Sequence, residues 1–422
     1  MEAIKSLYLR AYFIIMALYV YFNKGIAYSY LVEILWLGGI ILLVLNRHSY
    51  YFIWEKRIKI LLFFMLITLA YILWGIKNYS IIDTIRDSFI FEYGWFVFIL
   101  FLYQDKLNVI WGNLFHIYKW FPLVALLNFI LQYYLPFFDT FSLFGNVTFL
   151  LYKYGDMSVN LLICTLLILL NIDKLSNKWL LILTLLIFFD FLVISAYSRA
   201  GMLAYIAGGF CFIYFAKDKF INEALKGFTK FIPWALLIVL PIYLSIQVRE
   251  NFQGRVAGFK QIKDNVTSLV TNSDDQVLED NVVWRFLWWG KIIDYSFTKE
   301  NFIQGKGLGM SLSQTDEGVM AEEDLRSPHS IHLTIMARYG IPLFALWLYW
   351  LYLIFKPLFK SELNRYSLAI TSILLAFVVN ASFDVYLEGP MGAFPFWTWL
   401  GLLFITQSFP PKLNEENLDS IT

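Results

Sequence analysis

Long apolar runs separated by short polar segments dominate this sequence. A transmembrane helix needs roughly 17–25 predominantly apolar residues, and runs of that kind predict about twelve such helices. Their approximate ranges are 7–22, 29–45, 58–75, 88–103, 112–135, 157–172, 179–197, 199–216, 230–247, 331–355, 366–383 and 391–408. The pattern predicts an all-α integral membrane protein that lies in a lipid bilayer.

Composition supports this class. The chain is 59% apolar and 15% charged, whereas soluble domains are roughly 45–50% apolar and about 25% charged. These values exclude a soluble enzyme and a disordered scaffold, and the net charge of +1 indicates no nucleic-acid partner. Cys164 and Cys211 lie inside apolar runs, where they behave as small hydrophobic residues rather than as disulfide or metal ligands. The first apolar run lacks a small-residue cleavage site, so no cleavable signal peptide is expected.

The distribution of Lys and Arg predicts the orientation. With the N-terminus inside, the inner segments carry 17 basic residues and the short outer loops carry five, namely Lys24, Lys77, Arg86, Lys153 and Arg199. Basic residues accumulate on the cytoplasmic side of membrane proteins. Both termini are therefore expected to be cytoplasmic.

One connection is much longer than the others. Residues 248–330 carry 13 acidic and nine basic residues, which predicts a hydrated extracytoplasmic loop that contains short amphipathic helices. The chain thus divides into 1–247 with nine spans, the loop 248–330, and 331–422 with three spans and a cytoplasmic tail. Transporters are often built from two related halves, and no internal repeat is visible here.

Arg199 stands at the outer start of a predicted span. Ser198 before it is a good N-cap, and a helix N-terminus already favours anions. A cation at this point is either an arginine that snorkels to the interface or a clamp for phosphate, which the planar guanidinium binds through two parallel bonds. Gly201, Ala204, Ala207 and Gly208 give this span a small-residue face against which a neighbouring helix can pack closely.

Arg285 lies in an amphipathic pattern over 281–293 that is typical of a helix on the membrane surface. Val282, Phe286, Trp289 and Ile293 form the predicted apolar centre, and Arg285 falls inside the apolar arc while Lys291 lies opposite. A buried arginine costs roughly 2.5–3.5 kcal/mol on insertion scales unless it is paired. Its partner is either an internal carboxylate or a phosphate carried by a lipid.

His329 sits at the outer mouth of the tenth predicted span, close to Arg326 and three residues before His332. A histidine at this boundary can accept a proton near neutral pH, although capping or ordinary hydrogen bonding explains such a residue equally well. The last outer loop brings two carboxylates, Asp384 and Glu388, to the same side. Either can orient a base or hold a sugar hydroxyl.

Two further features of the sequence limit the candidate chemistry. Gly305, Gly307 and Gly309 form a G-x-G-x-G run outside any βαβ unit, which predicts a tight turn rather than a nucleotide site. No Asp-x-Asp pair occurs, and no His/Glu cluster has zinc spacing. Fixed cations without a metal suit a diphosphate substrate at the membrane surface.

Taken together, these motifs resemble the O-antigen ligase / O-antigen polymerase family, which are GT-C-type bacterial membrane glycosyltransferases. The resemblance covers roughly residues 195–408. It rests on the order of the motifs along the chain, their spacing and the side of the membrane on which they are predicted to lie. The matching motifs are Ser198-Arg199-Ala200-Gly201, Trp284-Arg285 through Trp289, Gly305 to Gly309, His329-Ser330, Arg338-Tyr339-Gly340, Ser382-Phe383-Asp384 and Phe396-Trp397. The family often has Ser-Arg-Gly where this chain has Ser-Arg-Ala-Gly.

The resemblance implies transfer of a glycan from undecaprenyl diphosphate to an acceptor hydroxyl at the periplasmic face of the bacterial inner membrane, with inversion and without a metal or other cofactor. Arg199 and Arg285 would bind the diphosphate, and His329 would act as base with Asp384 orienting it or the acceptor. Ser198, Arg326 and His332 are possible substrate contacts, and His332 competes with His329 as base.

The acceptor stays open. It is a sugar of the lipid A core for a ligase, or a second lipid-linked repeat for a polymerase. A protein O-glycosyltransferase of the same superfamily and a polysaccharide flippase or exporter are the alternatives. A flippase predicts charges at mid-membrane and an internal repeat, whereas the charges here gather at the outer face.

Overall fold

In the computed structural model the described residues are 2–47, 55–135, 137, 141–144, 147–150, 152–216, 219–245, 258–267, 276–312, 326–360 and 363–408, and within them the chain is helical without β-strands. The helices of the first half are α1 (Glu2–Phe22), α2 (Leu31–Leu45), α3 (Lys56–Asn78), α4 (Ile81–Glu92), α5 (Trp95–Phe101), α6 (Leu107–Tyr134), α7 (Tyr154–Leu170) and α8 (Asn177–Tyr197). The helices of the second half are α9 (Arg199–Phe215), α10 (Lys219–Thr229), α11 (Ile232–Ser245), α12 (Phe259–Thr267), α13 (Gln276–Ser296), α14 (Asn301–Gln304), α15 (Ile331–Phe355), α16 (Arg365–Ala381) and α17 (Pro390–Ser408).

The predicted all-helical membrane protein is confirmed at this level. Among the described residues, six helical segments are long and apolar enough to cross a membrane, and α2, α7, α9 and α16 are shorter apolar helices. The sequence predicts about twelve spans, whereas the described residues contain these six long segments and four shorter apolar helices. The fourth expected span, 88–103, is divided between α4 and α5, since the helix is interrupted at Tyr93 and Gly94.

Helix α7 lies in the middle of the bundle. Every residue from Gly155 to Leu170 is buried, which is expected of a helix that is hydrophobic all round. Helices α6, α8, α9 and α16 pack around it. The predicted small-residue face of α9 is used here, because a Cβ on Gly208 would lie 2.3 Å from Leu162 Cδ2 and 2.9 Å from the Ser372 carbonyl oxygen.

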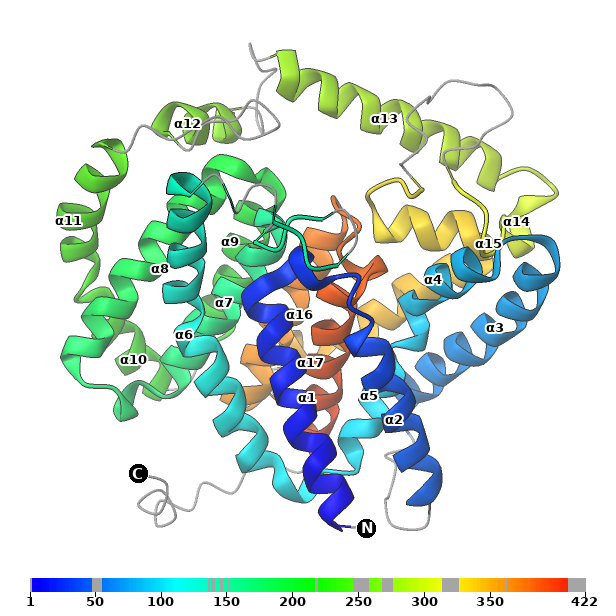
Figure 1. Ribbon diagram of the computed structural model, residues 1–422, viewed down its shortest axis with the longest axis horizontal. Coiled ribbons are helices and arrows are strands. Elements are labelled where there is room, and N and C mark those ends of the chain that lie inside the picture. Colours follow the sequence, from blue (N-terminus) through cyan, green and yellow to red (C-terminus); the bar gives the residue numbers. More distant parts are fainter. Residues whose placement is uncertain are drawn as a thin grey trace.

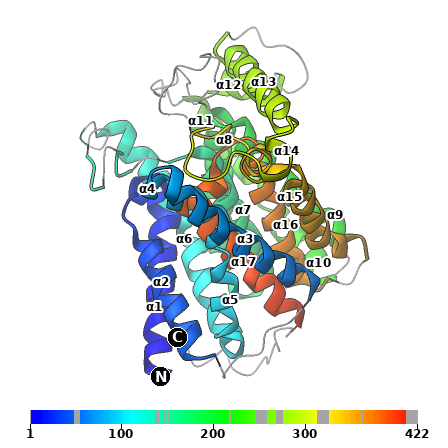
Figure 2. The same cartoon turned by 90° about the vertical axis from the view of Figure 1, so that its right-hand side faces the viewer.

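Helices α12 and α13 lie at one end of the bundle, above the ends of the long helices, whereas α1 begins at the opposite end (Figures 1 and 2). These helices belong to the long connection 248–330, so the expected loop subdomain contains helices among its described residues. We refer to this end of the molecule as the α13 end.

The packing face of α13 differs from the apolar centre expected from its sequence. Trp288 and Ile292 are buried against the protein, whereas Phe286 and Ile293, expected at the centre, are 65% and 43% exposed. Arg285 precedes Trp288 by three residues and Ile292 by seven, which places it on the packed side of the helix. The reason is that α13 packs against α15. The side of the helix that faces α15 is buried, and the apolar side chains on the other side stay exposed.

The predicted tight turn at Gly305, Gly307 and Gly309 is present, and it connects the loop to α15. Gly305, Gly307 and Gly309 all have positive φ angles, and the backbone N–H groups of Lys306 and Gly307 donate to the carbonyls of Ala337 and Arg338 at 2.8 and 3.0 Å. A Cβ at Gly305 would lie 2.5 Å from the Arg338 carbonyl. Only glycine permits backbone to approach backbone this closely.

A buried ion cluster holds the same turn to α4. The Asp87 carboxylate accepts from the Gly309 N–H at 3.0 Å and pairs with Arg338 at 2.9 Å and Arg326 at 3.2 Å. Arg338 is 1% exposed and also donates to the carbonyls of Gly307 and Met310. Because three segments meet at one carboxylate, the residues that precede α15 are held at a fixed place.

Candidate functional site

Asp384 is the centre of a charged cluster at the α13 end. It follows α16, and its Oδ1 accepts from Lys153 Nζ at 2.9 Å and from the Val385 N–H at 2.7 Å. His329 Nδ1 lies 3.7 Å from the same oxygen. The structure therefore brings together the two residues that the sequence nominated as catalytic, and it adds a lysine between them and the bundle.

The charges of this cluster stabilise one another. Burial opposes ionisation of Asp384, but Lys153 and His329 outweigh it and hold the pKa of the carboxyl well below its usual range. Burial likewise opposes the charge on Lys153, but Asp384 and Asp156 outweigh it and raise the pKa of the ammonium. At neutral pH the site therefore contains a carboxylate and an ammonium in direct contact.

His329 lies immediately before α15 in an unusual backbone conformation. Its φ is +55°, in the left-handed region that non-glycine residues seldom adopt. Two neighbouring contacts fix this segment, because Trp289 Nε1 donates to the Pro328 carbonyl at 2.7 Å and Ser327 Oγ donates to Glu388 Oε1 at 2.7 Å. Such strain tends to occur where a side chain must point in a set direction.

Arg285 approaches the cluster from α13. Burial lowers the pKa of its guanidinium, and the charge of Asp384 acts in the opposite direction. The Nε of Arg285 is buried and has no hydrogen-bond partner among the residues that the structure describes, although a buried polar group is normally paired. Trp289, one turn further along α13, contacts Phe383 with ring centroids 6.4 Å apart. Helix α13 thus covers both the His329 segment and the Asp384 loop.

Ser198 and Arg199 open α9 at the same end. Ser198 Oγ accepts from the Gly201 N–H at 2.9 Å, so Ser198 is the N-cap, as predicted. A Cβ on Gly201 would lie 3.0 Å from the Tyr154 carbonyl oxygen, which places the start of α9 against the start of α7. Arg199, the first residue of α9, and Lys153, the N-cap of α7, therefore stand at the starts of two adjacent helices.

The other two nominated contacts are engaged in protein interactions. Arg326 pairs with Asp83 at 3.3 Å and with Asp87 at 3.2 Å. His332 Nδ1 accepts from Trp347 Nε1 at 3.2 Å, and its Nε2 lies 3.0 Å from Ser382 Oγ. Since Nδ1 accepts, the Nε2 carries the proton in this arrangement. Both ring nitrogens of His332 are thus used to join α15 to the end of α16.

The sequence did not nominate Lys153, Asp156 or Asp87. Lys153 and Asp156 surround the start of α7, and Asp156 accepts from Asn23 Nδ2 at 3.3 Å. One signal was present, because two opposite charges three residues apart at the outer start of an apolar run are unusual. Their partners could not be read from it, since Asp384 is 231 residues away along the chain.

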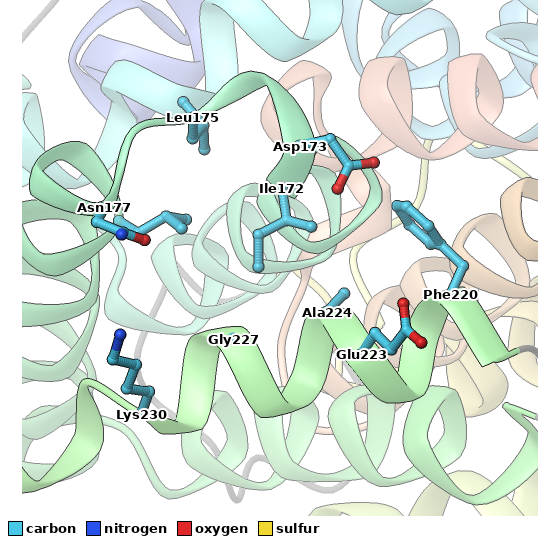
Figure 3. A pocket seen from close by; sticks show the side chains of 10 residues that line it. Ile172, Asp173, Leu175, Asn177, Phe220, Glu223, Ala224, Gly227 and Lys230 are labelled. Atoms are coloured by element: carbon cyan, nitrogen blue, oxygen red, sulfur yellow. The ribbon is translucent and has the colours of Figure 1, made fainter.

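A cavity of ≈ 320 Å³ lies at the other end of α7 (Figure 3). Asp173, Glu223 and Lys230 are its charged lining residues, and Ile172, Phe220 and Gly227 are among the others. It adjoins the residues that follow Leu170, so about 25 Å of helix, at 1.5 Å per residue, separates it from Lys153. This cavity is not part of the Asp384 cluster.

The class of the molecule follows from these findings: it is a multi-pass helical membrane protein with a charged cluster at one end. Comparison with known families then gives its type. Residues 160–348 match the family model Wzy_C, described as O-antigen ligase. The chain therefore carries an O-antigen ligase domain, the resemblance is confirmed over these residues, and this family implies a glycosyltransferase enzyme. No curated protein and no solved structure gave a significant match.

Proposed function

We propose that this protein transfers a glycan from undecaprenyl diphosphate to an acceptor hydroxyl, at the periplasmic face of the bacterial inner membrane. The acceptor is a sugar of the lipid A core or a second lipid-linked repeat unit. The α13 end is the periplasmic side in this proposal, and both termini are cytoplasmic. The reaction belongs to cell-surface polysaccharide synthesis, such as that of lipopolysaccharide or exopolysaccharide.

Arg199 and Arg285 are proposed to bind the diphosphate. A guanidinium donates two parallel hydrogen bonds to phosphate oxygens, and a cation that is held in place stabilises the negative charge of the leaving group as the glycosidic bond breaks. The buried, unpartnered Nε of Arg285 supports this role, because a phosphate oxygen would satisfy it. These two cations make a divalent ion unnecessary in the proposed mechanism.

His329 is proposed to take the proton from the acceptor hydroxyl, whose oxygen attacks the anomeric carbon with inversion. Asp384 faces Nδ1 of the imidazole, and Nε2 is the nitrogen proposed to take the proton. A carboxylate in this position orients the ring and stabilises the imidazolium that forms. His332, whose two ring nitrogens hold Trp347 and Ser382, is the weaker candidate for the base.

The observation that carries the proposal is the convergence of His329, Asp384 and Arg285 at the α13 end, within a chain that has an O-antigen ligase domain. Purified protein in detergent should be given undecaprenyl-diphosphate-linked repeat units, and released undecaprenyl diphosphate and glycan length should be measured. A ladder of longer glycans is expected of a polymerase. Release that requires lipid A core is expected of a ligase, and release that requires an acceptor protein is expected of a protein O-glycosyltransferase.

Two outcomes would contradict the proposal. Movement of the lipid-linked glycan across vesicles, without release of undecaprenyl diphosphate in any of the three reactions, would indicate a flippase. We also expect turnover to persist in EDTA, because Arg199 and Arg285 carry the charge stabilisation. A strict requirement for a divalent ion would reject the metal-independent mechanism while leaving glycosyl transfer itself intact.

A further inference from the structure

Lys153 occupies the point at which the first half of the chain meets the proposed catalytic pair. It is the N-cap of α7, and its side chain is 20% exposed. Its ammonium lies 2.9 Å from Asp384 Oδ1. This is the same oxygen that faces His329 Nδ1 at 3.7 Å. One carboxylate oxygen thus faces both the ammonium and the imidazole, and Lys153 is the nearer of the two.

The backbone of Lys153 is also fixed. Its N–H donates to Asn23 Oδ1 at 3.1 Å, and the Asn23 Nδ2 donates to Asp156 Oδ2 at 3.3 Å. Asn23 is fully buried and has a φ of +42°. Asn23, a strained and buried residue, therefore holds the start of α7. This contact fixes the position of the Lys153 backbone relative to Asp384.

Other charged or ionisable groups act on this contact from the surrounding elements. For Lys153 and Asp384 they are Lys24, Asp156, Arg285, Tyr386 and Glu388, and for His329 they are Asp384 and Glu388. Lys153 donates a side-chain hydrogen bond to Asp384 Oδ1 at 2.9 Å, whereas His329 Nδ1 lies farther from the same oxygen, at 3.7 Å. Removal of Lys153 therefore alters Asp384 more directly than the removal of any other cation in this group.

We infer that Lys153 is a positioning residue of the proposed glycosyl transfer, which holds Asp384 beside His329 and sets how strongly that carboxylate stabilises a proton on the imidazole. The inference rests on the proposed function. When the acceptor oxygen bonds to the anomeric carbon, its proton moves to His329 and the electron pair of the broken bond leaves on the diphosphate. The imidazolium then releases the proton to water. Because Lys153 shares the carboxylate, this release is easier than it would be from a His–Asp pair alone.

The test compares Lys153→Met with Lys153→Arg, and uses Lys299→Met as a matched control at an exposed position of the same end. Loss of the ammonium leaves Asp384 to His329 alone and removes a nearby positive charge. Both effects favour the imidazolium. In Lys153→Met, kcat should fall by about tenfold or more. The acid limb of the pH profile should move up by about one pH unit, and Lys153→Arg should restore both.

A second readout does not depend on turnover. Diethyl pyrocarbonate modifies neutral imidazole, so the pH dependence of carbethoxylation at His329, located by mass spectrometry, reports its protonation. The midpoint should move up in Lys153→Met and stay in place in Lys299→Met. In an Asp384→Asn background, adding Lys153→Met should move the midpoint much less, since the shared carboxylate is gone.

An unchanged midpoint in Lys153→Met would overturn the inference, even if activity fell. If Lys153→Met does not fold, Lys153→Gln is measured in the same way and the same midpoint decides. Wild-type protein that transfers no glycan with any acceptor would reject the proposed function separately, because the carbethoxylation midpoint is measured without substrate.

Discussion

At the scale of single residues, the site is recognisable because charges stand where apolar or neutral residues are expected. Arg285 lies within an apolar arc. Asp384 lies in the last outer loop, directly after the apolar span 366–383. A charge in such a place carries an energetic cost unless something pairs with it. The structure supplies internal partners for Asp384, whereas no described residue pairs with Arg285 Nε.

The geometry of the guanidinium should matter at Arg285. Arg285→Lys keeps the charge but loses the two-pronged donor and Nε, so kcat/KM should fall by about tenfold or more, equivalent to about 1.4 kcal/mol of transition-state stabilisation. Lys291→Arg, on the same helix, should change kcat/KM by less than about twofold. The measurement is release of undecaprenyl diphosphate under matched conditions. Equal and mild effects of the two substitutions would reject the diphosphate clamp.

Glu388 should make the folded protein less stable as the pH rises. Burial raises the pKa of this carboxyl. When the pKa of a carboxyl is higher in the folded than in the unfolded protein, the free energy of unfolding decreases as the pH rises from the unfolded to the folded value. Gln in its place still accepts from Ser327 and Thr334, which donate to Oε1 at 2.7 and 2.8 Å. The melting temperature of Glu388→Gln, relative to that of the wild type, should therefore increase as the pH is raised from 4 to 7.5.

The control for this prediction is Glu388→Ala, which removes both hydrogen bonds and should lower the melting temperature at every pH. A Gln variant that is less stable than the wild type at pH 7.5 would show that the charge of Glu388 stabilises the fold, through His329 or Arg338, more than burial opposes it.

At the scale of elements, the apolar helices are largely predictable because their lengths follow from the thickness of a bilayer. The ranges 29–45, 179–197 and 331–355 correspond closely to α2, α8 and α15. Their tertiary partners were not predictable. Lys153 looked like an ordinary outer-loop charge, because the carboxylate that holds it comes from a loop beyond α16. The packed side of α13 also depends on α15, which its own periodicity does not contain.

The link between α4 and the segment before α15 should be essential to the fold. Asp87→Asn leaves Arg338 buried without its charge partner, which typically costs 3–5 kcal/mol. Asp83→Asn, whose side chain is 31% exposed, removes a more superficial pair and should cost at most about 1 kcal/mol. Thermal unfolding of the two variants in detergent gives the comparison.

Activity gives a second check on Asp87. Because Arg326 is three residues before His329, release of Arg326 should lower kcat in Asp87→Asn even at temperatures where the variant stays folded. Equal stability of Asp87→Asn and Asp83→Asn would mean that the buried cluster does not hold the loop.

At the scale of the whole molecule, the proposed site extends beyond the matched family region. Residues 160–348 include Arg199, Arg285 and His329, whereas Lys153 comes before this region and Asp384 after it. The central position of α7 explains how these parts meet, since its first turn lies against both α9 and the end of α16. A fragment limited to the matched region would lack the carboxylate and its ammonium partner.

The orientation of the molecule gives the last prediction. Cys164 and Cys211 are both buried, so a cysteine introduced at an exposed position should dominate labelling by a maleimide that does not cross membranes. Lys299→Cys lies at the α13 end, and Lys178→Cys is exposed at the start of α8. The excess of basic residues on the side of Lys178 predicts that this side faces the cytoplasm. In spheroplasts, residue 299 should therefore be labelled directly and residue 178 only after permeabilisation.

The opposite result would have a specific consequence. If residue 178 were labelled in intact spheroplasts and residue 299 were not, the Asp384 cluster would face the cytoplasm, where lipid-linked glycans are assembled from nucleotide sugars rather than transferred from undecaprenyl diphosphate. The proposed acceptors would then be out of reach, although the geometry of His329, Asp384 and Lys153 would be unchanged. Sidedness is thus the property of the whole molecule on which the assignment of donor and acceptor depends.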